Sequence, residues 1–299
     1  MIDLQKLATE KKNPASKHID TMSTLEMMQV IHAEDQNAVN AVTPLLPKIA
    51  DAVDNIARRM RNGGRLIYCG AGTSGRLGIL DAVECPPTYS TPPELVVGLM
   101  AGGTDAIFRA KEGAEDDEVQ GKDDLASLSP TAQDTVVGLS ASGRTPYVVG
   151  ALQYARQLGA LTVAVACSPD SPIANVAEID LTATTGAEVV TGSTRMKAGT
   201  AQKMILNMLS TGAMVRLGKV YGNLMVDVAA TNEKLRERAL RIVMEIAACN
   251  RKEGEAALRK ADGQTKLAIL IARGNCTKEE AERILKDSDG QLSAALRLL

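Results

Sequence analysis

Aromatic side chains are almost missing from this sequence. It has no Trp, a single Phe and an aromatic fraction of 2% among 299 residues. Single-stranded nucleic acids bind on rows of stacked aromatic rings, so composition argues against this class of partner. The net charge of −2, from 34 Lys and Arg against 36 Asp and Glu, provides no basic surface for nucleic acid or an acidic membrane. The length of 299 residues is enough for one large or two modest domains, and the hydrophobic fraction of 45% is enough for a sizeable core.

Cysteine and long apolar runs are also sparse. The five cysteines lie far apart and form no CxxC pair, which argues against a disulfide framework and a zinc site (Cys69, Cys85, Cys167, Cys249 and Cys276). Residues 1–13 are polar and charged, unlike a signal peptide. No apolar run approaches the roughly 20 residues of a membrane helix. We therefore expect a reduced, cytoplasmic protein that does not bind membranes.

Short apolar runs alternate with helical patterns along most of the chain. Such runs, bounded by glycines, are typical of buried parallel strands covered by helices on both faces, so we expect an α/β fold. The expected strands are 65–69, 95–100, 135–139, 161–166 and 179–183. One helix is expected to start after residue 24. Further helices are expected at 47–61, 74–83, 147–158, 195–217 and 232–260. Pro86 and Pro87 should end the third of these helices, and the last 40 or so residues should form a small all-helical module.

A glycine-rich loop follows the first expected strand and opens a helix. It runs Gly70-Ala71-Gly72-Thr73-Ser74-Gly75 and matches GxGxxG, a dinucleotide fingerprint. Glycines let the backbone approach an anion, and a helix N-terminus offers free amides. A dinucleotide site also needs an acidic residue about 20 positions on, at the end of the second strand. That strand ends instead in Ala101-Gly102-Gly103-Thr104, which favours a phosphate ester.

A second loop of this kind follows the strand at 135–139. It runs Ser140-Ala141-Ser142-Gly143-Arg144-Thr145 and brings hydroxyls, a glycine and an arginine to a strand-to-helix turn. A single loop of this type is most often an ordinary turn or N-cap. Two at the carboxyl ends of neighbouring strands favour a ligand, because open α/β sheets bind ligands there.

A third polar segment precedes the helix expected at 195–217. Ser193 and Thr194 supply hydroxyls, and Arg195 and Lys197 supply cations. Cations at a helix start are mildly unfavourable, so either an anionic ligand or a buried acidic partner would explain them.

Candidate acids and bases must be carboxylates, because the only histidines, His18 and His32, precede the sheet. Glu84 lies near the end of the helix that the glycine loop opens, where the negative end of the helix dipole favours a proton-donor role. Glu115 belongs to an acidic run whose plainest interpretation is a solvated surface, and spacing alone does not single it out.

Two long segments resemble the N-acetylmuramic acid 6-phosphate etherase family. RLIYCGAGTSGRLGILDAVECPPTYSTPPELVVGLMAGG at 65–103 is similar to it, and GAEVVTGSTRMKAGTAQK at 186–203 matches a signature shared with the glucokinase regulatory protein. The lead-in at 9–36 is also similar. The resemblance implies an N-terminal arm and helix at 1–50, a sugar isomerase (SIS) domain at 51–245 that binds a phosphosugar, and a UBA-like helical module at 246–299.

The resemblance also implies an activity. The substrate would be N-acetylmuramic acid 6-phosphate, cleaved at its D-lactyl ether to N-acetylglucosamine 6-phosphate and D-lactate in cell-wall recycling. A homodimer with its site near the subunit interface is implied, with no metal or organic cofactor. The two catalytic glutamates of the family fall on Glu84, expected to donate a proton, and Glu115, expected to act as base. The substrate-binding residues fall in the three polar segments (Gly72, Thr73, Ser74, Gly75, Ser140, Ser142, Gly143, Thr145, Ser193, Thr194 and Lys197).

Three alternatives stay open at this point. An aldose–ketose isomerase could use the same fold. A sugar-phosphate-sensing regulator would share the signature, although the known regulator carries two SIS halves and this chain has one. A nicotinamide-dependent oxidoreductase is disfavoured by the missing acidic residue.

Overall fold

The computed structural model describes residues 10–227 and 233–299. Residues 1–9 of the expected arm and Asn232 of the expected last long helix lie outside this range. Contacts divide the described residues into two compact units, one within Met1–Val83 and Glu94–Gly212 and the other within Glu84–Pro93 and Ala213–Leu299. No helix among the described residues is long and apolar enough to cross a membrane.

The first unit is built on a parallel five-stranded sheet, as the sequence predicts. The strand order is β2-β1-β3-β4-β5, and every neighbouring pair is parallel. The strands are β1 (Leu66–Gly70), β2 (Val96–Met100), β3 (Thr135–Ser140), β4 (Leu161–Ala166) and β5 (Ile179–Thr182). The chain moves outward from β1 to β2 and then returns to place β3 on the other side of β1. The sheet therefore reverses its direction of growth between β1 and β3.

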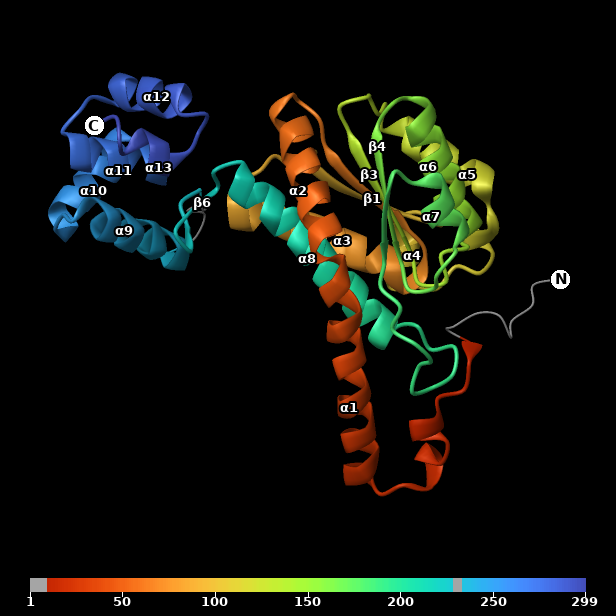
Figure 1. Ribbon diagram of the computed structural model, residues 1–299. Coiled ribbons are helices and arrows are strands. Elements are labelled where there is room, and N and C mark those ends of the chain that lie inside the picture. The colour runs from red at the N-terminus through yellow and green to blue at the C-terminus, as the bar shows by residue number, and fades with distance from the viewer. Residues whose placement is uncertain (1–9, 228–232) are drawn as a thin grey trace. The chain divides into compact units, whose positions relative to one another are not determined.

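Helices cover both faces of this sheet. In Figure 1, α5, α6 and α7 lie on one side, and α2, α3 and α8 lie on the other. The helices of this part of the chain are α1 (Thr24–Val42), α2 (Leu46–Arg61), α3 (Gly72–Tyr89), α4 (Asp105–Phe108), α5 (Glu118–Ser127), α6 (Pro146–Gln157), α7 (Pro172–Val176) and α8 (Lys197–Arg216). The expected three-layer α/β architecture is confirmed.

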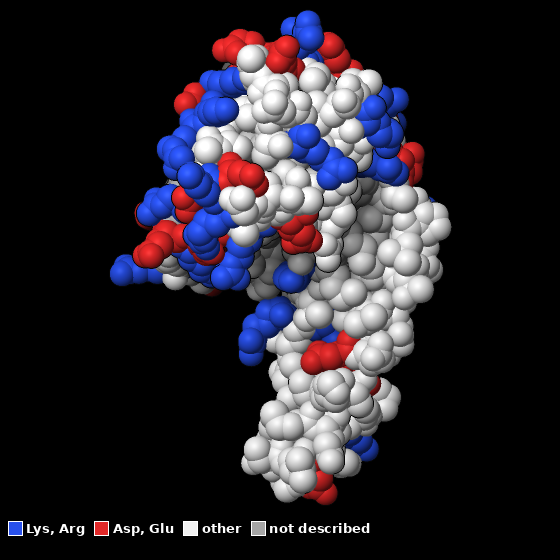
Figure 2. Space-filling model, turned by 90° about the vertical axis from the view of Figure 1, so that its left-hand side faces the viewer, with Lys and Arg blue, Asp and Glu red and all other residues white. Residues whose placement is uncertain are grey.

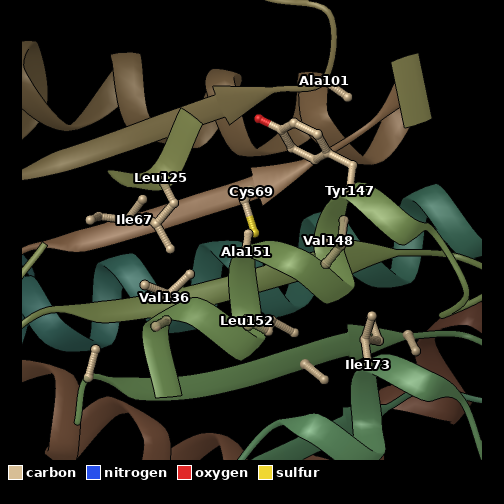
Figure 3. Packing of buried hydrophobic residues seen from close by; sticks show 14 residues of the cluster. Ile67, Cys69, Ala101, Leu125, Val136, Tyr147, Val148, Ala151, Leu152 and Ile173 are labelled. Carbon is tan, nitrogen blue, oxygen red and sulfur yellow. The ribbon is translucent and has the colours of Figure 1, made fainter. Parts of the chain in front are cut away.

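Small and β-branched side chains fill the core, as the scarcity of aromatics requires. On one face, Ile67 and Cys69 of β1 pack with Val136 of β3 and with a row of residues from α6 (Figure 3). Tyr147 is the large exception in this cluster. Its ring is fully buried, and its hydroxyl donates to Asp124 Oδ2 at 2.8 Å, so the polar group is satisfied. Burial first, and then this hydrogen bond, raise the pKa of Tyr147.

Helix α1 projects from the first unit (Figure 1). It starts at a capping box, in which Ser23 Oγ accepts from the amide of Glu26 and the carboxylate of Glu26 accepts from the amide of Ser23. Only Ala38 and Val42 of this 19-residue helix are buried. Most of α1 is therefore not covered by the residues that the structure describes.

The predicted end of helix α3 is wrong. Pro86 and Pro87 do not end it, and the helix continues to Tyr89. A proline forbids an amide hydrogen bond at its own position, but its carbonyl still accepts, and Ser90 N donates to Pro86 O at 3.0 Å. The helix stops at Ser90, whose φ of 51° is left-handed.

The second unit is mainly helical, as expected for the C-terminal region. It contains a small hairpin that the sequence did not indicate, β6 (Val220–Tyr221) with β7 (Leu224–Met225). Its helices are α9 (Glu233–Ala247), α10 (Arg251–Lys260), α11 (Thr265–Gly274), α12 (Lys278–Asp287) and α13 (Leu292–Ala295). The buried face of α11 supplies much of the core.

The single helix expected at 232–260 is wrong. Two helices, α9 and α10, occupy this span. Ala248 adopts a left-handed φ of 53°, and Asn250 begins α10 with a capping box to Glu253. The pattern Asn-x-x-Glu is a helix-start signal, and it outweighs the continuous helical periodicity.

Candidate functional site

The glycine loop is a tight turn between β1 and α3. Gly70 ends the strand, Ala71 is the only connecting residue, and Gly72 begins the helix with a φ of 53°. A Cβ on Gly75 would lie 2.5 Å from both Gly70 O and Met100 Sδ, so only glycine permits this close approach. The first amides of α3 have no partner within the helix and point at the carboxyl edge of the sheet.

Ser74 faces the protein interior from this turn. Its side chain is buried, and Ser74 Oγ donates to Gln202 Oε1 of α8 at 2.8 Å. The hydroxyl of Ser74 therefore ties α3 to α8, while its backbone amide remains in the first turn.

Three hydroxyls gather after β3, as the sequence predicts. Ser140 Oγ lies 2.8 Å from Thr145 Oγ1 and 3.4 Å from Ser142 Oγ. The amide of Gly143 donates to Ser140 Oγ at 3.0 Å, and Gly143 has a φ of 68°. The turn thus holds three hydroxyl groups and an amide in one small volume, which suits an anion with several oxygens.

These two turns flank the place where the sheet reverses its direction of growth. Gly70 pairs in register with Leu139, so the turn after β1 and the turn after β3 start side by side. Open α/β sheets bind ligands at this point. The topology therefore brings together the two loops that the sequence singled out.

Glu115 lies beside the start of α3. Together with Ala71, Gly72, Arg76 and Lys111 it lines a cavity of about 160 Å³. It sits in a 3₁₀ turn, Ala114–Asp116, that follows Gly113. Two residues of the acidic run, Glu112 and Glu115, line this cavity. Spacing alone did not single out one carboxylate of the run as a candidate base, and the cavity favours these two.

Arg76 stabilises the wall of this cavity through two hydrogen bonds. Its Nε donates to Ile107 O at 2.8 Å and its Nη2 to Ala106 O at 2.7 Å. These carbonyls belong to α4, so the guanidinium ties α4 to the first turns of α3.

Glu84 does not line the Glu115 cavity. It is an exposed residue of α3, twelve positions after Gly72. At a rise of 1.5 Å per residue this is about 18 Å along the helix axis. The glycine turn and Glu84 therefore lie near opposite ends of one helix.

The third polar segment contains an ion pair between a buried lysine and a half-buried glutamate. Lys197 is 1% exposed, its ammonium pairs with Glu34 Oε2 of α1, and it donates to Ala187 O at 2.7 Å. Burial opposes ionisation of Glu34, but hydrogen bonds from Lys197 and Asn13 outweigh it and hold the pKa of Glu34 below 4.5. For Lys197, the buried acidic partner is thus the explanation that the structure bears out.

A second acid caps α8. Glu188 is fully buried, and its two carboxylate oxygens accept from the amides of Lys197 at 3.1 Å and Ala198 at 2.9 Å. Glu34 could not be singled out from the sequence, because its partner Lys197 is 163 positions away. Ser193 and Thr194 lie in the turn between these anchored residues.

Two buried hydroxyls that follow β4 were also not predicted from the sequence. Within the described residues, Ser168 Oγ and Ser171 Oγ have no hydrogen-bond partner. Ser171 borders the turn after β3, because a Cβ on Gly143 would lie 2.3 Å from it. The stretch Ser168-Pro169-Asp170-Ser171 directly after an expected strand was a usable signal.

Another cavity, of about 530 Å³, is lined by Glu34, Ala187 and Lys197 of the ion pair described above. A cavity of about 920 Å³ lies between α9 and α10 and is lined by ion-paired side chains such as Glu237 and Arg251. In the ranges 10–227 and 233–299, no group of three or more His, Cys, Asp or Glu side chains could hold a metal ion.

Comparison with known proteins identifies the fold family. A model of the glucokinase regulatory protein N-terminal SIS domain matches residues 48–156, and a model of the SIS domain matches residues 118–212. A putative phosphosugar isomerase involved in capsule formation from Bacteroides fragilis superposes with a TM-score of 0.51 and 24% identity. This structural match covers 65% of the chain and 91% of that protein and supports the SIS fold.

Curated relatives cover far more of the chain. N-acetylmuramic acid 6-phosphate etherase 2 of Vibrio parahaemolyticus is 58% identical over 270 residues, or 90% of each chain. The N-acetylmuramic acid 6-phosphate etherase of Aeromonas hydrophila is 59% identical over 270 residues, 90% of this chain and 91% of that one. The etherase of Pasteurella multocida is 58% identical over 265 residues, 89% of this chain and 88% of that one. On this extent of identity, the chain belongs to the N-acetylmuramic acid 6-phosphate etherase family.

Proposed function

We propose that this protein cleaves the D-lactyl ether of N-acetylmuramic acid 6-phosphate. The products are N-acetylglucosamine 6-phosphate and D-lactate. The observation that carries the proposal is the meeting of the two phosphate-type turns and the Glu115 cavity where the sheet reverses, in a chain 58% identical to etherases over 90% of its length. The expected place of the reaction is cell-wall recycling in the cytoplasm, which the five free cysteines support.

The phosphate would bind between the turns after β1 and β3. The amides of Gly72, Thr73 and Ser74 at the start of α3 favour an anion through their free N–H groups and the helix dipole. The hydroxyls of Ser140, Ser142 and Thr145 add donors that suit the remaining phosphate oxygens, and Gly143 fixes this turn, because its amide donates to Ser140 Oγ. Gly75 contributes by letting α3 approach β1 closely.

The segment before α8 is proposed to contact the sugar. Ser193 and Thr194 carry the hydroxyls for this contact, and Thr194 O and Thr73 border Gly199 of α8, which puts the segment near the first turn of α3. Because the ammonium of Lys197 is held by Glu34 and Ala187, its part in binding would be to fix the position of this segment.

The reaction needs an acid and a base, since an alkoxide is a poor leaving group. Opening the sugar to its aldehyde makes the proton on C2 acidic. Glu115 takes this proton, and the bond from C3 to the lactyl oxygen breaks while Glu84 gives that oxygen a proton. Water then adds to C3 of the unsaturated aldehyde, so that the balance is one ether and one water converted into two alcohols.

The direct test is an assay for D-lactate released from N-acetylmuramic acid 6-phosphate. Glu115→Gln and Glu84→Gln should each lower kcat at least 100-fold, the usual contribution of a positioned acid or base. Asp116→Asn is the matched control, because it removes the same charge next to Glu115 without lining the cavity. Release of D-lactate at the normal rate by either glutamine variant would remove that glutamate from the mechanism.

We further propose that the active form is a homodimer. Exposed apolar side chains occur on two helices, Leu25 at 68% and Met28 at 47% on α1, and Leu80 at 47% and Val83 at 59% on α3. The lower part of Figure 2, where α1 and its lead-in project, is mostly free of charged side chains. Such surfaces are typical of contacts with another chain. Residues 246–299 are proposed to form a UBA-like module that follows, along the chain, a phosphosugar-binding domain at 51–245.

A further inference from the structure

A glutamine is buried where α8 packs against the start of α3 (Figure 1). Gln202 of α8 is 1% exposed, and its Oε1 accepts a hydrogen bond from Ser74 Oγ at 2.8 Å. Ala201 beside it and Ile205, three positions further along α8, are fully buried. Gln202 thus brings a polar amide into an otherwise apolar contact between two helices, where its polar atoms depend on partners from the protein.

One half of this amide has no such partner. Within the described residues, Gln202 Nε2 is buried and makes no hydrogen bond. A buried donor without a partner lowers stability, whereas an apolar group of the same shape at its place can be neutral or stabilising. If packing were its only purpose, a methionine would fill this position about as well. The amide is better explained by what it does to Ser74.

Ser74 belongs to a turn that has much backbone freedom. Three of the six residues at 70–75 are glycine, which loses more conformational freedom on ordering than any other residue. The first turn of a helix also has amides without partners in the helix. The buried side chain of Ser74 ties this turn to α8. Its bond to Gln202 therefore fixes the direction of the amides that the proposed function assigns to the phosphate.

Gln202 is itself held in a defined position on α8. The buried carboxylate of Glu188 accepts from the first two amides of this helix and so fixes its start. A Cβ on Gly199 would lie 3.6 Å from Thr73 Cγ2, and Gln202 follows Gly199 at a step of three on the same face. A capped helix start thus supports the glutamine, and the glutamine supports the first turn of α3.

We propose that Gln202 is a positioning residue for the phosphate. It holds Ser74 toward α8 before the ligand arrives, so the free amides of this turn are already aligned and binding carries less ordering cost. This inference rests on the proposed function and adds a residue that acts without touching the substrate. The phosphate is on C6, away from C2 and C3, so it is bound alike in the ground state and the transition state. Loss of Gln202 should therefore raise KM and leave kcat nearly unchanged.

The Gln202→Met variant tests this role. Methionine has a similar volume but cannot accept from the hydroxyl of Ser74. The Kd for N-acetylglucosamine 6-phosphate, measured by titration calorimetry, should rise about tenfold or more. The KM for N-acetylmuramic acid 6-phosphate should rise by a similar factor, while kcat stays within about threefold of the wild-type value. Gln202→Asn is a second test and should behave in the same way, because its amide is one methylene too short to reach Ser74.

Ser210→Ala is the matched control. Ser210 lies about two turns further along α8 and donates to Asp81 Oδ1 of α3 at 3.1 Å, so its bond joins the same helices away from the glycine turn. This variant should keep the Kd within about twofold of wild type. In thermal unfolding, Gln202→Met should melt within about 3 °C of Ser210→Ala, because loss of the unpartnered Nε2 offsets loss of the hydrogen bond.

The outcomes separate this inference from the proposed function. If wild-type protein binds the sugar phosphate and both Gln202 variants bind it equally well, the inference is wrong and the proposed function stands. An equal loss of affinity in Ser210→Ala, or a Gln202→Met protein that melts far below this control, would show that Gln202 only supports the fold. A fall in kcat with unchanged KM would also overturn the inference. If wild-type protein neither binds the sugar phosphate nor releases D-lactate, the proposed function is wrong, and the inference is wrong with it.

Discussion

The buried ion pair between Glu34 and Lys197 leads to a sharp prediction about stability. Lys197 is 2% exposed in its side chain and Glu34 is 17% exposed. Removing one partner of such a pair leaves a buried charge without compensation and costs about 3–5 kcal/mol. In Glu34→Gln the ammonium keeps Ala187 O but loses the carboxylate. For a unit of this size the melting temperature changes by about 2–4 °C per kcal/mol, so we expect a fall on the order of 10 °C.

Differential scanning calorimetry measures this change, with Asp35→Asn as the matched control on the same helix. The double variant Glu34→Gln, Lys197→Met should be more stable than Glu34→Gln alone, because it removes the unpaired charge. If Glu34→Gln melts within about 2 °C of Asp35→Asn, which corresponds to less than about 1 kcal/mol, the pair does not hold the segment before α8 as we infer.

The pH dependence of this variant has a definite sign. The pKa of Glu34 in the folded protein is below its ordinary value of 4.5. The contribution of the pair to stability is therefore fully present above about pH 4.5 and is lost as the pH falls through the folded-state value. Wild-type protein and Glu34→Gln should thus converge in melting temperature as the pH is lowered below 4.5.

Two further predictions concern local packing. Gly121→Ala should destabilise the first unit by about 1–3 kcal/mol or more, because its Cβ would lie 1.9 Å from Tyr147 O between α5 and α6. Gly199→Ala in α8 should not destabilise it, because no neighbour lies nearer than 3.6 Å to that Cβ. Urea unfolding of the two variants compares them. Asn250→Ala should lower the stability of the second unit by about 0.5–2 kcal/mol, because it removes the cap of α10. Asn250→Ser keeps a capping side chain and should retain most of this stability. Equal loss of stability in both variants would argue against the capping role.

The sequence predicted the sheet well because its signals are local. Each strand is a short apolar run between turn residues, and the five expected strands occur within one or two residues of 65–69, 95–100, 135–139, 161–166 and 179–183. The hairpin at Val220–Met225 escaped prediction because strands of two residues have no measurable periodicity. The helix end expected at Pro86 was wrong because a proline removes only its own amide hydrogen bond, while its carbonyl still accepts, as Pro86 O does from Ser90 N.

The candidate site was likewise predictable only where its signals are local in the sequence. The turns after β1 and β3 carry their own signatures, so Gly72 and Ser140 could be found from the sequence. The partnership of Lys197 with Glu34 could not, because the two residues are 163 positions apart and nothing in the sequence near Lys197 points to Glu34. The position of Glu115 beside Gly72 likewise depends on the path of a loop between β2 and α5. What the sequence lacked in each case was long-range geometry.

The pairing of β1 with β3 has a consequence for biosynthesis. Gly70 and Leu139 are neighbours in the sheet but lie 69 positions apart, so the second phosphate-type turn is synthesised well after the first. Closing such a distant contact is slow compared with forming local helices. If the two turns bind the phosphate together, as proposed, a nascent chain gains this binding site only once β1 and β3 have paired. From that moment a bound sugar phosphate would favour the completed fold by mass action, which links the supply of ligand to the yield of folded protein.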